Sequence, residues 1–289
     1  MTELSEDALA RFKGLVYDRC HLSFPESRET QFRRSISVRA EKRGHGSFED
    51  YYRALMSDDR EFEQLIALIT TRETYFFRMP EQFEALSKAV LPELADREGK
   101  KAMNAISRGE TYRMRLRAWS AGCATGQEAY SLSMRILDTI RYPKAWDLKV
   151  LGTDINAEAV ELARAGRYDH MRLGNMPASF LKRYFTSCPS EELIVSDEVK
   201  TISEFRILNL KRLPDMDSLR NYFDIIFCRN VMIYFDLSAQ QLLVTALADC
   251  LAPGGYLFTG EGEVLHLYRH PFEVHEREGC LCYKKPEKT

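Results

Sequence analysis

The chain has 289 residues, with 41 Lys and Arg against 43 Asp and Glu, and 45% of its residues are hydrophobic. This composition excludes a disordered tail and predicts one large or two modest folded domains. A formal net charge of −2 provides no global positive field for a polyanion, which disfavours a dedicated nucleic-acid binder. The acidic N-terminus does not resemble a signal peptide, and no segment approaches the roughly 18 uncharged apolar residues of a membrane span. We expect a soluble, cytoplasmic protein without direct membrane insertion.

Cysteine and histidine usage points to neither disulfides nor a metal. The seven cysteines are odd in number and scattered, which does not suit a disulfide framework in a chain of this length. The six histidines show no metal-ligand spacing, and Cys280 and Cys282 alone are too few ligands for zinc. We therefore expect reduced thiols and no metal site.

Residues 1–80 are predicted to form a small all-α domain. Ser47 provides an N-cap hydroxyl, and the acids Glu49 and Asp50 follow it in the first helical turn. Apolar residues recur at the i, i+3, i+4, i+7 spacing of a buried helix face: Phe62, Leu65, Ile66 and Ile69. No strand pattern is found in this part of the chain.

The segment Arg28–Arg43 is the strongly basic part of this domain. It carries six basic residues against the two acids Glu29 and Glu41. Phe32 and Ile36 lie between the charges, so the charges form no single stripe. The segment is interpreted either as a solvated helix face or as a surface that docks an acidic partner.

From about residue 115 the pattern changes to short apolar runs that alternate with helical segments. The expected strands are 115–121, 149–154, 205–208, 223–228 and 256–258, and the expected helices are 128–140, 157–165 and 238–251. A Pro253-Gly254-Gly255 turn should separate the last helix from the strand after it. This order predicts an α/β domain over residues 81–289, with a doubly wound, Rossmann-like sheet and a final antiparallel hairpin within 272–284.

One interval is too long for a simple connection. Nearly forty residues separate the helix that ends near Gly166 from the next core strand, whereas such loops usually have about 2 to 6 residues. Residues 193–195 and 199–202 resemble strands. We expect a small β-subdomain inserted at about residues 172–203.

The turn after the first strand carries the clearest ligand signal. Its spacing, Gly122-x-x-x-Gly126, is neither the dinucleotide fingerprint nor a phosphate loop, and no lysine follows to hold a phosphate. Glu128 at the helix start would repel a phosphate but attract a cationic or sulfonium ligand. Asp154 ends the next strand, where an acid accepts hydrogen bonds from ribose hydroxyls. Together these features favour S-adenosylmethionine over NAD.

Each acid also has an ordinary structural explanation. Glu128 would interact favourably with the helix dipole, and Asp154 would cap the helix that follows it. The occurrence of both acids at the ends of consecutive strands, after a glycine turn, favours the cofactor site.

Several motifs occur in order along the chain: Thr74–Arg78 (TYFFR), Trp119–Ser131 (WSAGCATGQEAYS), Leu151–Asp154 (LGTD), Asn209–Leu210, Cys228–Phe235 (CRNVMIYF) and Leu251–Phe258 (LAPGGYLF). In this combination the sequence resembles the CheR family of chemotaxis receptor methyltransferases. The resemblance implies an enzyme that transfers a methyl group from S-adenosylmethionine to glutamate side chains on the cytoplasmic helices of chemoreceptors. From its charge, the basic segment Arg28–Arg43 is predicted to dock on the acidic surface of such a helix.

Carried over motif by motif, the resemblance implies a set of cofactor contacts: Arg72, Thr74, Arg78, Glu128, Asp154, Asn209, Leu210, Arg229 and Asn230. Arg78 and Tyr234 would face the reacting groups as catalytic residues. Two departures are visible. Arg72 stands where the family often has asparagine, and Gly260–Glu263 (GEGE) replaces the commoner Gly-His-Ser-Glu.

Two other functions remain open from the sequence. A methyltransferase for amino groups of a small molecule or nucleic acid would be expected to carry an Asn/Asp-Pro-Pro-Tyr-like motif, where this chain has Cys228-Arg229-Asn230. A non-catalytic cofactor sensor is the other alternative, which a turnover assay would test. The turn Pro189–Glu192 lacks the glycine that some family members use to hold a receptor C-terminal peptide, which favours an enzyme without such a tether.

Overall fold

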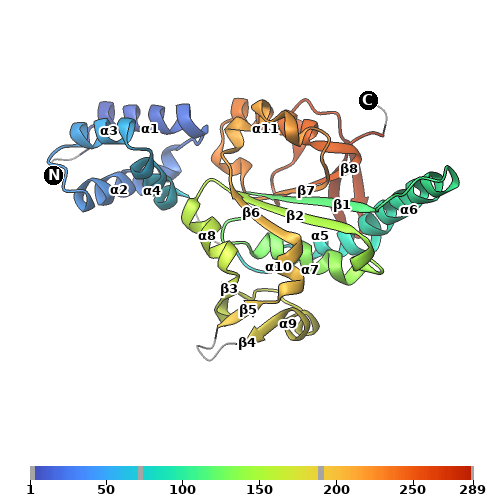
Figure 1. The fold of residues 1–289 in the computed structure, drawn as a ribbon. Helices are drawn as coiled ribbons and strands as arrows, with labels where there is room; N and C mark the ends of the chain where they lie inside the picture. Colours follow the sequence, from blue (N-terminus) through green and yellow to red (C-terminus); the bar gives the residue numbers. More distant parts are fainter. Residues whose placement is uncertain (1–3, 71–73, 188–191, 288–289) are drawn as a thin grey trace.

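The computed structural model describes residues 4–70, 74–187 and 192–287. A group of N-terminal helices lies to one side of a large central sheet, and a small second sheet lies beside it (Figure 1). Within the described residues, no helix is long and apolar enough to cross a membrane.

The N-terminal group consists of four helices: α1 (Glu6–Cys20), α2 (Glu26–Lys42), α3 (Phe48–Ser57) and α4 (Asp59–Ile69). The predicted cap at Ser47 is confirmed, because its hydroxyl accepts a hydrogen bond from the Asp50 N–H at 3.1 Å. The predicted apolar face of α4 is also confirmed, since Phe62, Leu65, Ile66 and Ile69 are all buried.

Three of the six basic residues in the segment Arg28–Arg43 pair with acids within the protein. Arg39 is buried, and its guanidinium donates to both carboxylate oxygens of Glu61 at 2.9 and 2.5 Å. Arg33 pairs with Glu29, and Arg43 pairs with Asp58 at 3.3 Å. The interpretation of the whole segment as one surface is therefore wrong for Arg39, which lies inside the helical group.

The central sheet has seven strands in the order β6-β2-β1-β7-β8-β10-β9. The strands are β1 (Arg115–Ala121), β2 (Asp147–Asp154), β6 (Ser203–Ile207), β7 (Phe223–Cys228), β8 (Leu251–Thr259), β9 (Glu273–Arg277) and β10 (Cys280–Lys284). The first five in this order pair in parallel, whereas β10 is antiparallel to both β8 and β9. The predicted Rossmann-like class and the final hairpin are confirmed.

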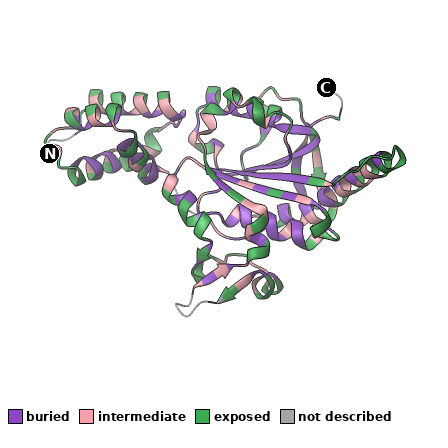
Figure 2. Ribbon diagram, in the orientation of Figure 1, coloured by how far each residue is buried: buried purple, intermediate pink, exposed green. Residues whose placement is uncertain are grey.

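Helices cover both faces of this sheet, as Figure 2 shows by the buried strands between partly exposed helices. The flanking helices are α5 (Pro80–Ala85), α6 (Leu91–Ser107), α7 (Gln127–Thr139), α8 (Ala157–Ala165), α10 (Asp197–Ile202) and α11 (Leu237–Cys250). Successive residues of β1 enter different cores, because strand side chains alternate between faces. Ala118 packs in the core beneath α7, and Trp119 packs in the core that α11 shares with the N-terminal helices.

The interval after α8 forms a three-stranded antiparallel sheet in the order β3-β5-β4. Its elements are β3 (Arg167–Tyr168), α9 (Ala178–Tyr184), β4 (Phe185–Ser187) and β5 (Leu193–Val195). The expected strand at 199–202 is wrong, because these residues belong to α10. Ser196 precedes α10 and the acids Asp197 and Glu198 open it, which is a helix-start signal that outweighs the β-branched residues.

The turn expected at Pro253-Gly254-Gly255 is also wrong. Strand β8 begins at Leu251, directly after α11, and the three residues lie within it. The register against β7 shifts between Phe223 and Ile225, so the strand absorbs the extra residues as a bulge.

The glycine turn between β1 and α7 depends on the absence of a side chain at Gly122. This residue has φ +83°, and a Cβ added there would lie 2.3 Å from Cγ2 of Val231. Gly262 has nearly the same backbone angle, φ +81°, but no atom lies within 4 Å of an added Cβ. A substitution at Gly262 therefore adds backbone strain alone, whereas a substitution at Gly122 adds the same strain and a clash with Val231.

Replacing Gly122 with Ala should lower the free energy of unfolding by about 1 to 3 kcal/mol more than replacing Gly262 with Ala, because only the first substitution forces atoms to move. Urea unfolding followed by circular dichroism measures both values. Equal losses for the two variants would show that Val231 imposes no constraint on the turn.

Candidate active site

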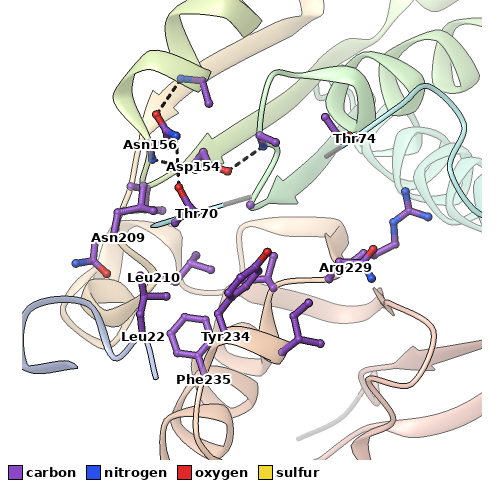
Figure 3. A pocket seen from close by; sticks show the side chains of 18 of the residues that line it. Leu22, Thr70, Thr74, Asp154, Asn156, Asn209, Leu210, Arg229, Tyr234 and Phe235 are labelled. Carbon is purple, nitrogen blue, oxygen red and sulfur yellow. Dashed lines mark hydrogen bonds between the residues drawn. The ribbon is translucent and has the colours of Figure 1, made fainter. Parts of the chain in front are cut away.

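A cavity of about 310 Å³ lies at the carboxyl ends of β1, β2 and β7 (Figure 3). Residues of the predicted site from several elements line it together: Thr74, Arg78, Glu128, Asp154, Asn209, Leu210, Arg229, Asn230 and Tyr234. Arg72, the remaining predicted contact, lies outside the described residues. The cavity therefore gathers side chains that are separated by up to 160 positions in the chain.

Several lining residues were not identified from the sequence. Cys20, Leu22 and Thr70 come from the N-terminal helices and close one side of the cavity. Phe235 and Asn156 come from the sheet domain. Only Asn156 carried a usable signal, since it follows Asp154 at the N-cap position of α8.

Asp154 is held in place by backbone donors. Its Oδ2 accepts the Ala124 N–H and its Oδ1 accepts the Asn156 N–H, both at 2.9 Å. The helix cap is Asn156, whose Oδ1 accepts the Ala159 N–H at 3.1 Å. The alternative that Asp154 is itself the cap of α8 is therefore wrong, and the carboxylate lies on the cavity wall with its orientation fixed by the glycine turn.

Glu128 is not an isolated anion. Its Oε1 accepts a hydrogen bond from the Ser120 hydroxyl at 2.7 Å, and its Oε2 accepts one from Nε of Arg229 at 2.7 Å. The Arg229 side chain is only 1% exposed, so the pair is shielded from solvent. The cavity wall carries a neutralised pair at this point, where the sequence had suggested a free carboxylate.

Arg229 ties three further parts of the chain together. Its Nη1 donates to the carbonyl oxygen of Arg78 at 2.6 Å and to Oε1 of Gln82 at 3.0 Å. The Gln82 amide in turn donates to the carbonyl oxygen of Thr259, at the end of β8. The guanidinium also lies 5.1 Å from the ring centre of Phe227. The backbone of Arg78 is thereby fixed at the cavity.

The two asparagines of the predicted site, Asn209 and Asn230, form hydrogen bonds that hold the segments of the cavity wall in place. The Asn209 amide donates to the carbonyl oxygen of Arg19 at 2.8 Å, which joins the end of α1 to the sheet domain. Asn230 has φ +57°, and its N–H donates to Oε2 of Glu263 at 2.6 Å.

Glu263 supports this loop from the GEGE segment. Its carboxylate also accepts the N–H groups of Gly260, at 2.7 Å, and Ile233, at 3.3 Å. Burial raises the pKa of Glu263 above its ordinary value, despite these backbone donors. The departure from the family pattern therefore retains an acid that orders the loop after β7.

Tyr234 lies in the short 3₁₀-helix η6 (Met232–Tyr234), and its hydroxyl points into the cavity (Figure 3). The N-terminal helices hold this residue from behind. The Ser23 N–H donates to the Tyr234 carbonyl oxygen at 2.8 Å, and Leu22 forms a β-bridge with Phe235. The Arg28 guanidinium lies 4.5 Å from the centre of the Tyr234 ring. The position is thus built by both parts of the chain, which excludes a simple sheet-edge aromatic.

Neither the cavity thiol, Cys20, nor the buried Cys123 of the glycine turn is poised as a nucleophile. Burial raises the pKa of Cys20 to about 12 and that of Cys123 well above its ordinary value. A thiol at neutral pH with such a pKa is almost wholly protonated. Among the described residues, no group of three or more His, Cys, Asp and Glu side chains is arranged to hold a metal ion.

A Rossmann-like sheet with a carboxylate after its second strand, and a cavity at the strand carboxyl ends, is typical of enzymes that bind a cofactor with a ribose. The comparison with known families narrows this class to methyltransferases. Residues 72–279 match the family described as "CheR methyltransferase, SAM binding domain", and residues 7–70 match "CheR methyltransferase, all-alpha domain". The chain belongs to the CheR methyltransferase family.

Similar proteins carry the same description. The "Chemotaxis protein methyltransferase" of Escherichia coli is 35% identical over 272 residues, which cover 91% of this chain and 87% of that protein. The "Chemotaxis protein methyltransferase 1" of Pseudomonas aeruginosa is 37% identical over 209 residues, which cover 71% of this chain and 70% of that protein. This chain is accordingly an S-adenosylmethionine-dependent chemotaxis protein methyltransferase. The lining fits the cofactor, because it combines an oriented carboxylate with apolar side chains such as Leu210 and Phe235.

Replacing Arg229 with Lys should lower the free energy of unfolding by about 2 to 3 kcal/mol. Lysine keeps the charge but cannot reach Glu128, Gln82 and the Arg78 carbonyl at once. The control is Arg53→Lys, in an exposed pair with Glu49 at 3.4 Å, which should change stability by no more than about 0.5 kcal/mol. Urea unfolding measures the free energy of unfolding of both variants. An equally small loss for Arg229→Lys would show that Arg229 does not hold these segments together.

Proposed function

We propose that the protein transfers the methyl group of S-adenosylmethionine to glutamate side chains on the cytoplasmic helices of chemoreceptors, forming glutamate methyl esters in receptor adaptation. The observation that carries the proposal is that the Tyr234 hydroxyl and Arg78 line the same cavity as the oriented carboxylate of Asp154. The enzyme would act in the cytoplasm, where these receptor helices lie.

The chemistry of a glutamate acceptor matches the groups in the cavity. A glutamate carboxylate has an ordinary pKa of about 4.3, so at neutral pH it is already ionised and needs no general base. The described lining residues include no histidine, and burial raises the pKa of the lining thiol Cys20 to about 12, so it stays protonated at neutral pH. Bound S-adenosylmethionine supplies an electrophilic methyl group on a positively charged sulfur.

The proposed roles of Tyr234 and Arg78 follow from how the charge changes during transfer. The acceptor carboxylate loses charge towards the transition state, so strong ion pairing would stabilise the ground state more than the transition state. A neutral hydroxyl such as that of Tyr234 orients the acceptor oxygen without this penalty. Arg78, whose backbone Arg229 fixes, would orient the substrate or cofactor at the cavity edge. Positioning and exclusion of water would then supply most of the rate.

The site residues can be tested by separating binding from transfer. Asp154→Ala should weaken S-adenosylmethionine binding by about 30- to 150-fold, because two charge-assisted hydrogen bonds are lost, about 2 to 3 kcal/mol. Tyr234→Phe keeps the ring and should leave cofactor affinity nearly unchanged while it lowers kcat. Calorimetry with the cofactor and steady-state methyl transfer to a receptor cytoplasmic fragment measure the two effects.

Asp154→Asn is the companion variant, since its side-chain oxygen can still accept one of the two backbone hydrogen bonds, from Ala124 or from Asn156. A Tyr234→Phe enzyme that turns over at the wild-type rate would return Tyr234 to a packing role. If the wild-type enzyme transferred no methyl group to receptor fragments, the proposal itself would fail, and the cofactor sensor would be favoured.

The contact with the receptor is proposed to use the exposed charges of α2. Arg34 and Lys42 are exposed and, among the described residues, form no ion pair, whereas Arg33, Arg39 and Arg43 are paired within the protein. The turn Pro189–Glu192 favours an enzyme without a receptor tether, and its residues 189–191 lie outside the described residues.

Reversing Arg34 and Lys42 to Glu should raise the KM for the receptor fragment several-fold at low salt, and the effect should shrink as salt rises. The control reverses Arg141 and Lys144, which are also exposed but precede β2 at the opposite end of the strands from the cavity. Cofactor affinity should not change in either variant. Equal KM values for the two variants would show that the exposed charges of α2 are only solvated and do not contact the receptor.

A further inference from the structure

Four exposed apolar side chains lie on two segments, one that flanks Tyr234 and one that follows Glu263. Ile233 is 46%, Leu237 67%, Val264 37% and Leu267 66% exposed, and Ile233 also lines the cavity. We call these four residues the apolar rim. Exposed apolar side chains gathered at one site of a protein mark a contact surface, whereas isolated ones need no explanation.

The two segments that carry the apolar rim are fastened to each other. Glu263 accepts the N–H of Ile233, and Val264 is the next residue in the chain. On α11, the Gln240 amide donates to the carbonyl oxygens of Met232 and Phe235 at 2.7 and 2.9 Å. The Tyr268 hydroxyl donates to Oε1 of the same glutamine. The rim is therefore a preformed surface next to Tyr234, which loses little conformational entropy when a partner binds.

A cation lies over the Tyr234 ring. Arg28 lies over its ring from α2, and one of the Arg28 guanidinium nitrogens, Nη1, is buried and has no hydrogen-bond partner. Tyr234 thus adjoins both a positive charge from α2 and Ile233 of the apolar rim. A helix with acidic side chains on one side and apolar side chains on the other would complement both walls.

We propose that the apolar rim binds the apolar side chains that flank the acceptor glutamate on the substrate helix. This inference rests on the proposed function, and it adds the selectivity of the site. A glutamate on a helix brings the residues three and four positions away to within about 5 to 6 Å on the same face. When the glutamate enters the cavity towards Tyr234, these neighbours lie at its mouth, where Ile233 begins the rim. The enzyme selects glutamates with apolar neighbours and rejects those surrounded by charges, because a charge against the rim would lose its hydration.

The test replaces two exposed rim residues together, Leu237→Ser and Leu267→Ser. The KM for a receptor cytoplasmic fragment should rise by about 10-fold or more, since apolar burial is lost. Cofactor affinity and the unfolding midpoint should stay at wild-type values. The control is Ile106→Ser, because Ile106 is 68% exposed at the end of α6, which projects away from the N-terminal helices (Figure 1).

Salt dependence separates the rim from the charges on α2. The rim variant should keep the wild-type dependence of KM on salt, because its charges are intact. A receptor KM within twofold of the Ile106→Ser control would overturn the inference while leaving the proposed function in place. A wild-type enzyme that does not methylate receptor fragments would overturn both. If sedimentation showed a wild-type dimer that the rim variant dissociates, with KM unchanged, the rim would be an interface between two copies and the inference would also fail.

Discussion

The site depends on one buried ion pair, between Arg229 and Glu128. A buried pair stabilises a fold only when its remaining hydrogen-bonding groups are also satisfied. Here Ser120 donates to the carboxylate, and the Arg78 carbonyl and Gln82 accept from the guanidinium. The pair thereby connects the helix after the glycine turn, the end of β7 and the segment before α5. It fixes the cavity wall before any ligand arrives, as preorganised binding and catalysis require.

The N-terminal helices complete the site from the other side. They share a hydrophobic core with α11 and contribute Cys20, Leu22 and Thr70 to the cavity. Backbone contacts from Leu22 and Ser23 hold η6, and Asn209 joins the end of α1 to the sheet domain. The all-α part therefore both builds the cavity around Tyr234 and places the Arg28 guanidinium of α2 over the Tyr234 ring.

The sequence predicted the sheet and the two acids that line the cavity, Glu128 and Asp154, because local signals carry them. Strand periodicity, the glycine turn and Asp154 at a strand end can each be recognised within a short segment. Contributions across domains could not be found in this way: nothing local indicates that Leu22 reaches Phe235, or that Arg39 is buried against Glu61. The helix at 197–202 was missed because its β-branched residues suggested a strand. Ser196 followed by the acids Asp197 and Glu198 is nevertheless a pattern typical of a helix start.

The central claim is that the methyl group is delivered to a carboxylate. The most direct measurement is mass spectrometry of a receptor cytoplasmic fragment after incubation with the enzyme and labelled S-adenosylmethionine, with half of each sample treated with mild alkali. The account predicts a methyl group on glutamate residues that alkali removes, because esters hydrolyse in base. A methyl group that survives alkali, or one located on lysine, arginine or a terminal amine, would contradict it.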